Sequence, residues 1–175
     1  MWPWGHAILA YGVVTLLMIL YRRRSLGGAE AVAVVIGSQI PDLIDKPLGW
    51  TLGLLPSGRS LGHSLFTWVV LSALLVLLLR RLDRQSLALP VIGGFLVGIL
   101  TDVPRAVLAG DFSMATFLLW PVLPSPVYDV EPSILANFAR VQPADVERLL
   151  LFAGALIGIH LLLSWFRPPE RLASD

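Results

Sequence analysis

Two aspartates spaced three residues apart, Asp42 and Asp45, are the residues best placed to do chemistry. They follow an apolar run and lie between Pro41 and Pro47, in a chain with few charges. A carboxylate near the hydrocarbon core of a bilayer costs roughly 2.5–3.5 kcal/mol on insertion scales, so such a residue usually marks a functional site. The pair therefore predicts a site whose other members come from elsewhere in the chain.

Two histidines and a third aspartate supply the remaining groups for a divalent-ion site. Imidazole nitrogens and carboxylate oxygens suit zinc, the favoured ion, or manganese or iron. Carboxylates that share a low-dielectric pocket repel one another, and a divalent cation relieves that repulsion. A water molecule bound to such an ion supplies hydroxide near neutral pH, which is the chemistry of a metal-dependent hydrolase. The predicted metal ligands are His6, Asp45, His63 and Asp102.

Three further residues are predicted to be catalytic. Asp42 lies one helical turn from Asp45, so it is expected to orient a ligand or to act as general base. Arg59 lies four residues before His63, and its guanidinium would clamp a phosphate or carboxylate of the substrate. An anchor at the membrane interface is an equally good interpretation of Arg59. The Ser64 hydroxyl would orient a ligand or a histidine, and its use as a nucleophile is a weaker hypothesis.

The composition is that of a membrane protein, with 56% hydrophobic and 14% charged residues among 175. A soluble domain carries about 25% charged residues. The absence of cysteine excludes disulfides and thiolate metal sites, and the net charge of +1 gives no reason to expect nucleic acid. We predict an all-α fold, a polytopic membrane helix bundle in one domain over residues 1–175. The predicted spans are residues 6–21, 29–43, 61–79, 87–108 and 149–166.

The basic residues orient these spans. Eight of them fall on one side of the membrane and five on the other, which predicts an external N-terminus and an internal C-terminus. The second span is short, so it is expected to be tilted, to lie deeper in the bilayer, or to continue into the turn with the aspartates. This topology brings the predicted ligands to the outer ends of four spans. Residues 110–147 are expected to form a partial lid over that face, although an ordinary connecting loop explains them equally well.

Four motifs carry a family resemblance: Trp4-Gly5-His6-Ala7, Ile40-Pro41-Asp42-Leu43-Ile44-Asp45, Arg59-Ser60-Leu61-Gly62-His63-Ser64 and Phe117-Leu118-Leu119-Trp120-Pro121. From residue 6 to about residue 120, the chain resembles the YdjM-like family of inner-membrane metal-dependent hydrolases. The resemblance implies a metal site in the membrane. A fainter likeness to zinc-dependent phospholipase C proteins, which also begin with a tryptophan and an early histidine, implies phosphoester substrates.

The fourth span departs from the family pattern. Asp102 matches the last acidic position, but Gly98 stands where the family has histidine. Gly93, Gly94 and Gly98 form a stripe of small residues, which predicts close helix packing. Gly98 is then expected to leave space beside Asp102.

The combined prediction is a membrane-bound metal-dependent hydrolase acting on a phospholipid-like phosphoester or another amphiphilic ester that reaches the site from the bilayer. The site is expected to face the extracytoplasmic side of the cell membrane. A non-catalytic membrane scaffold or regulatory protein, with a structural metal or ion-pair cluster, is the alternative from another class. An ion or metal transporter is a third hypothesis, weakened because no ladder of acidic residues or histidines leads to the inner face.

Overall fold

The structure, a computed structural model, describes residues 3–126 and 142–165. Within these ranges all regular structure is helical, so the predicted all-α fold is confirmed for the described part. In chain order the elements are α1 (Pro3–Arg22), α2 (Gly28–Asp45), the π-helical segment η1 (Lys46–Thr51), α3 (Leu65–Arg81), the 3-10 turn η2 (Gln85–Leu87), α4 (Ala88–Thr101), α5 (Arg105–Leu108), the 3-10 segment η3 (Phe112–Leu119) and α7 (Pro143–Trp165).

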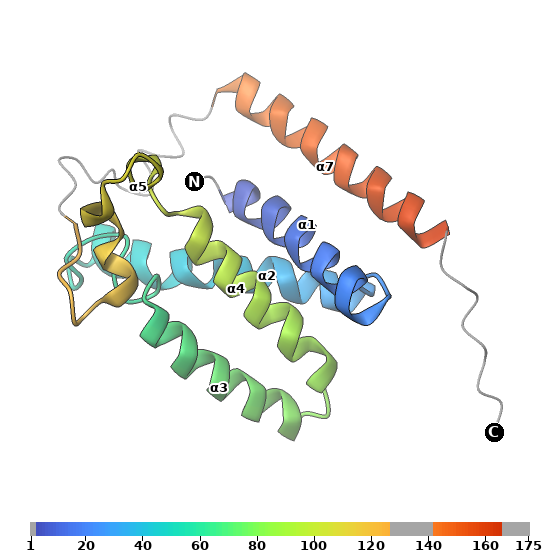
Figure 1. Cartoon of the computed structure of the whole chain (residues 1–175), viewed down its shortest axis with the longest axis horizontal. Coiled ribbons are helices and arrows are strands. Elements are labelled where there is room, and N and C mark those ends of the chain that lie inside the picture. The colour runs from blue at the N-terminus through green and yellow to red at the C-terminus, as the bar shows by residue number, and fades with distance from the viewer. Residues whose placement is uncertain (1–2, 127–141, 166–175) are drawn as a thin grey trace.

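The helices pack so that the chain returns repeatedly to one end of the bundle. Helices α1, α2 and α4 contact one another, α3 packs against α4, and α7 contacts α1 (Figure 1). The start of α1, the end of α2, the start of α3 and the end of α4 all lie at the left in Figure 1, beside α5 and η3. Residues that are far apart in the sequence therefore have the opportunity to meet there.

Helices α2 and α4 form the closest pair because glycines remove the side chains between their backbones. A Cβ atom built on Gly94 would lie 2.2 Å from the carbonyl oxygen of Val34, and one on Gly98 would lie 2.5 Å from that of Ser38. The predicted close packing through these glycines is confirmed. The expected space beside Asp102 is wrong, because the α2 backbone fills the volume that a side chain at residue 98 would need.

An ion pair closes the connection between α1 and α2 at the opposite end from the site. The Arg24 guanidinium donates to both carboxylate oxygens of Glu30 at 2.6 and 2.7 Å, and Glu30 also accepts from the Gly27 amide at 2.9 Å. The hydrogen bond to Glu30 raises the pKa of Arg24 above its usual value. This turn makes α1 and α2 antiparallel, so residues early in α1 lie beside residues late in α2.

The second predicted span continues past its proline. Helix α2 runs through Pro41 to Asp45, and η1 follows it without a break. A proline in a helix removes the hydrogen bond that its own N–H would have made and crowds the carbonyl of the preceding turn, and helices in membranes tolerate this where neighbouring groups satisfy the freed backbone. Because the helix continues, Asp42 and Asp45 lie on successive turns, and both are buried.

The third and fourth predicted spans have different bounds from those expected. Helix α3 begins at Leu65 rather than near residue 61, because the Ser64 side chain caps it by accepting from the Phe66 amide at 3.2 Å. The span predicted over residues 87–108 is broken after Thr101 and resumes as α5 beyond Pro104, whose backbone is extended. His63 and Arg59 therefore lie in a loop, and Asp102 lies at a helix end.

Many large apolar side chains are exposed, whereas several charged side chains are buried. Large apolar side chains face outward along α1 and α3, among them Leu16, Leu20, Val69, Val70 and Leu77. Buried polar and charged residues include His6, Glu30, Asp42, Asp45, His63 and Asp102. Among the described residues, α1 has the length and hydropathy needed to cross a membrane, and the stretch Gln85–Thr101 is apolar but shorter.

Candidate metal centre

The carboxylate of Asp45 organises the loop that precedes α3. It accepts hydrogen bonds from the backbone amides of Ser60 and Gly62, both at 2.7 Å, and of His63 at 3.2 Å. The loop reaches this position because residue 62 is a glycine, whose Cβ atom would otherwise lie 2.5 Å from the carbonyl oxygen of Pro41. Asp45 is fully buried, so these donors supply the solvation that water would otherwise give.

His63 is oriented by the same carboxylate. Its Nδ1 lies 2.8 Å from Asp45 Oδ2, and because a carboxylate can only accept, Nδ1 carries the proton. Its Nε2 then points to the other two aspartates, at 3.2 Å from Asp102 Oδ2 and 3.7 Å from Asp42 Oδ1. Phe117 of η3 packs edge-on against the imidazole, with 6.1 Å between ring centroids.

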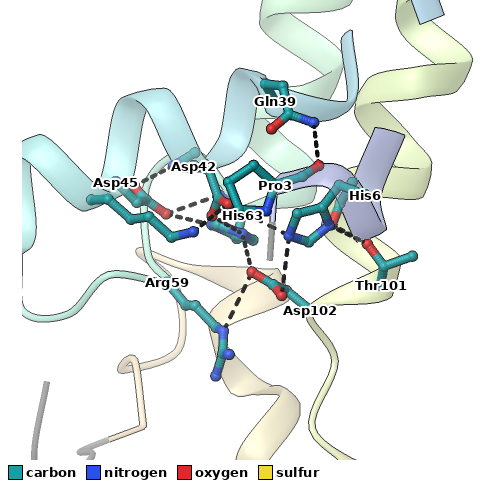
Figure 2. Close-up of polar contacts among 12 residues, drawn as sticks. Pro3, His6, Gln39, Asp42, Asp45, Arg59, His63, Thr101 and Asp102 are labelled. Carbon is teal, nitrogen blue, oxygen red and sulfur yellow. Dashed lines mark hydrogen bonds and ion pairs between the residues drawn. The ribbon is translucent and has the colours of Figure 1, made fainter. Parts of the chain in front are cut away.

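His6 approaches the same aspartates from α1 with a different partner behind it. Its Nδ1 lies 2.6 Å from the Thr101 hydroxyl, which donates its own proton to the Gly98 carbonyl at 2.9 Å. The hydroxyl therefore accepts from Nδ1–H, which leaves a lone pair on Nε2 in the neutral ring. Nε2 lies 3.5 Å from Asp42 Oδ2 and 3.5 Å from Asp102 Oδ1 (Figure 2).

His6, Asp42 and Asp102 together form a buried group that could hold a metal ion. One ligand atom from each lies within 4.8 Å of the others. Two buried atoms of this group, His6 Nε2 and Asp42 Oδ1, have no hydrogen-bond partner among the described residues. Buried polar atoms in native proteins are almost always paired, so an unpartnered nitrogen and an unpartnered oxygen within one buried group fit a bound cation.

Two cations lie beside the carboxylates of this group. Lys46 Nζ forms an ion pair with Asp42 Oδ2, and the two residues are one helical turn apart. Arg59 Nε lies 3.7 Å from Asp102 Oδ2, so Asp102 contacts His6, His63 and Arg59 (Figure 2). The site therefore combines three carboxylates, two imidazoles and two permanent cations at one end of the bundle.

Part of the predicted lid lies on this site. Besides Phe117, the segment after η3 contributes the Trp120 carbonyl, which accepts from the Ser64 hydroxyl at 2.5 Å. The Ser125 hydroxyl donates to the Arg59 carbonyl at 2.8 Å and lies 2.7 Å from the Ser57 hydroxyl. Residues 127–141 of the predicted lid lie outside the described residues, and residues 143–147 begin α7.

Comparison with known families identifies the kind of chain that carries this site. The profile of the family described as YdjM inner membrane protein matches residues 1–168. The chain belongs to this family. The resemblance inferred from the sequence motifs is therefore confirmed, and the family description implies association with the bilayer of the inner membrane. No curated protein and no solved structure matches the chain.

In this YdjM-family chain, six of the seven residues singled out from the sequence lie in one cluster. They are His6, Asp42, Asp45, Arg59, His63 and Asp102. The seventh is Ser64, whose hydroxyl caps α3 by accepting from the Phe66 amide and donates to the Trp120 carbonyl. The sequence-based prediction missed Thr101 and Lys46. A signal for each exists: Thr101 directly precedes Asp102 after an apolar run, and Lys46 lies four residues after Asp42.

Proposed function

We propose that this YdjM-family protein is a membrane-bound, metal-dependent hydrolase of amphiphilic phosphoesters. The observation that carries the proposal is the pair of buried, unpartnered atoms, His6 Nε2 and Asp42 Oδ1, within a group of three potential ligands. Membership of the inner-membrane family supports the location. Zinc suits a nitrogen and two carboxylates in a closed pocket, and manganese or iron(II) are the alternatives.

The geometry favours an exchange of the roles expected for the two aspartates. Asp45 already accepts four hydrogen bonds, three from backbone amides and one from His63. Asp42 has an unpartnered oxygen that faces the group. We therefore assign Asp42, with His6 and Asp102, to the ion, and Asp45 to the support of His63.

The two histidines take different parts in this proposal. A neutral hydroxyl backs His6, which keeps its Nε2 lone pair available to a metal. A carboxylate holds His63 and raises the basicity of its Nε2, which points at Asp102 and Asp42, and we assign His63 the role of proton acceptor. A bound divalent ion would supply Lewis acidity and lower the pKa of a water molecule. His63 would accept a proton at Nε2, and Arg59 would bind the anionic group of the substrate.

An apolar groove supports the proposal that the substrate is amphiphilic. It has a volume of about 330 Å³ and lies between α1, α2 and α7. Its lining includes Ala7 and Tyr11 of α1, Val35 of α2 and Ile157 of α7. A groove of this composition suits an acyl chain, and Ala7 directly follows His6 in the sequence.

The exposed apolar side chains support several membrane crossings. In this proposal α1, α2, α3, α4 and α7 all cross, with the metal group near the extracytoplasmic surface. Arg22, Arg23, Arg80 and Arg81 lie at the end of the bundle away from the metal group, as the positive-inside rule requires of a cytoplasmic end.

Elemental analysis of the full-length protein in detergent tests the metal centre. The wild type is expected to carry stoichiometric metal, whereas His6→Ala and Asp42→Asn lose it and remain folded by circular dichroism. Asp83→Asn, an exposed acid after α3, is the matched control and should keep the metal. Hydrolysis of bis(p-nitrophenyl) phosphate should follow metal content across these proteins.

The scaffold alternative gives a different pattern. If the cluster is an ion-pair network, the purified wild type contains no stoichiometric metal, and His6→Ala lowers the melting temperature without changing any metal content. Full metal occupancy in both His6→Ala and Asp42→Asn would contradict the assigned ligands.

A further inference from the structure

Two cations, Lys46 and Arg59, lie outside the carboxylates of the candidate metal group. Their side chains are 19% and 28% exposed, whereas those of the carboxylates they contact, Asp42 and Asp102, are 8% and 3% exposed. Lys46 comes from the turn that follows α2, and Arg59 comes from the loop before α3. The cations therefore form an outer layer at the rim of the buried cluster.

The charge of this cluster changes sign when a divalent ion is added. Counted over the described side chains alone, and with both histidines neutral, three carboxylates face two cations, which leaves one negative charge in excess. A divalent cation turns this excess into one positive charge. An unbalanced charge in a buried site is costly, so the loaded cluster favours one bound anion.

We propose that the metal-loaded centre binds one singly charged oxyanion of the phosphodiester type between Lys46 and Arg59. The inference rests on the proposed metal site and names the substrate group that the site takes. The two cations contact carboxylates of one group, whose ligand atoms lie within 4.8 Å of each other, and in this proposal one anion is bound by both. Arginine offers phosphoryl oxygens a fork of N–H donors, and lysine offers a compact charge.

Trp50 keeps Lys46 at the rim. The Lys46 ammonium lies 5.5 Å from the centroid of the Trp50 ring, within the range of a cation–π contact. The indole packs on Gly58, where an added Cβ atom would lie 2.3 Å from Nε1. Trp50 is thus a positioning residue, which holds the ammonium near the anion when Asp42 is shared with a metal ion.

Equilibrium dialysis of radiolabelled dimethyl phosphate against Mn²⁺-loaded, full-length protein in detergent tests the inference. The wild type is expected to bind the anion, and Lys46→Gln and Arg59→Gln should each weaken binding at least tenfold while retaining bound manganese. Arg105→Gln removes an exposed cation of α5 and is the matched control, with affinity equal to that of the wild type. The metal-free wild type should not bind the anion.

The outcomes separate this inference from the proposed metal centre. If both Lys46→Gln and Arg59→Gln bind manganese and bind dimethyl phosphate with wild-type affinity, the anion site is overturned but the proposed metal centre is not. A wild type that binds no manganese overturns both. Tighter binding of acetate than of dimethyl phosphate overturns the phosphodiester assignment.

A competition experiment identifies the source of the phosphodiester. Dihexanoyl phosphatidylglycerol and unlabelled dimethyl phosphate each compete with the radiolabelled dimethyl phosphate. If the lipid displaces the label at the lower concentration, the site binds a lipid headgroup. Equal or weaker displacement assigns it to a free phosphodiester.

Discussion

His6 and His63 present the same ring nitrogen, Nε2, to the same two carboxylates, but their Nδ1 atoms are hydrogen-bonded to different groups. His6 Nε2 lies 3.5 Å from both Asp42 and Asp102, and His63 Nε2 lies 3.7 and 3.2 Å from them. The Thr101 hydroxyl holds His6, whereas the Asp45 carboxylate holds His63. In the proposed function this asymmetry makes His6 the metal ligand and His63 the proton carrier, and the first predictions test that assignment.

Replacing His63 with glutamine should separate metal binding from turnover. Because His6, Asp42 and Asp102 remain, His63→Gln is expected to keep its metal content. Loss of the proton acceptor should lower hydrolysis of bis(p-nitrophenyl) phosphate by roughly 10²–10⁴-fold, the usual contribution of general acid–base catalysis. Elemental analysis and the rate are measured on the same preparation. Loss of the metal together with the rate would instead make His63 a ligand.

The Thr101 hydroxyl is expected to tune metal affinity without touching the ion. Thr101→Val removes the acceptor that fixes His6 Nδ1–H, so metal affinity should fall by about 10–100-fold, as for other groups that orient a metal-binding histidine. Competition with a metal-sensitive chelator measures the change, and Thr101→Ser should restore it. Thr15→Val makes the same replacement at a buried hydroxyl of α1 that has no partner among the described residues. An equal loss of affinity in Thr15→Val would contradict the role of Thr101.

Asp45 should matter for folding more than for the ion. In Asp45→Asn an amide N–H₂ replaces one of the oxygens that accept from the loop amides, so at least one buried donor faces another donor. We expect a loss of about 3 kcal/mol in the free energy of unfolding. Thermal unfolding in detergent measures it beside Asp42→Asn, which should lose metal but little metal-free stability. If the two metal-free variants were equally stable, Asp45 would not be the organising carboxylate.

Much of the site followed from the sequence because membrane topology restricts where polar residues can lie. Apolar runs and basic flanks placed His6, the two aspartates, His63 and Asp102 at one end of the bundle, and the structure brings them into contact. The residue types and their order along the chain were enough to predict this convergence, since charged side chains avoid the apolar surface and gather inside.

The roles within the site could not be predicted in the same way. The sequence does not reveal that the loop before α3 folds its amides onto Asp45, the observation on which the proposed role of Asp45 rests. It does not reveal that α2 continues through Pro41 or that the α2 backbone fills the space beside Gly98. Each of these depends on backbone positions set by packing between distant segments, not on local propensity.

The contact between α2 and α4 predicts the effect of adding a methyl group at Gly98. Gly98→Ala places a Cβ atom against the Ser38 carbonyl, so α2 must move, at a cost of about 1–3 kcal/mol in stability. Gly154→Ala on α7, where an added Cβ atom meets nothing within 4 Å, is the control and should be neutral. Thermal unfolding of both variants decides the matter. A stable Gly98→Ala protein would mean that the two helices are farther apart than described.

The proposed orientation can be tested with single cysteines because the chain contains none. Ser113 of η3 and Ser86 of η2 are both exposed, and these two segments lie at opposite ends of the bundle (Figure 1). If the metal group faces the extracytoplasmic side, a membrane-impermeant maleimide should label Ser113→Cys in intact spheroplasts and Ser86→Cys only after permeabilisation. Because both variants replace a serine with cysteine, each variant is the control for the other. The reverse pattern would place the metal group on the cytoplasmic side, and labelling of both in intact spheroplasts would show that η2 is not separated from η3 by the membrane.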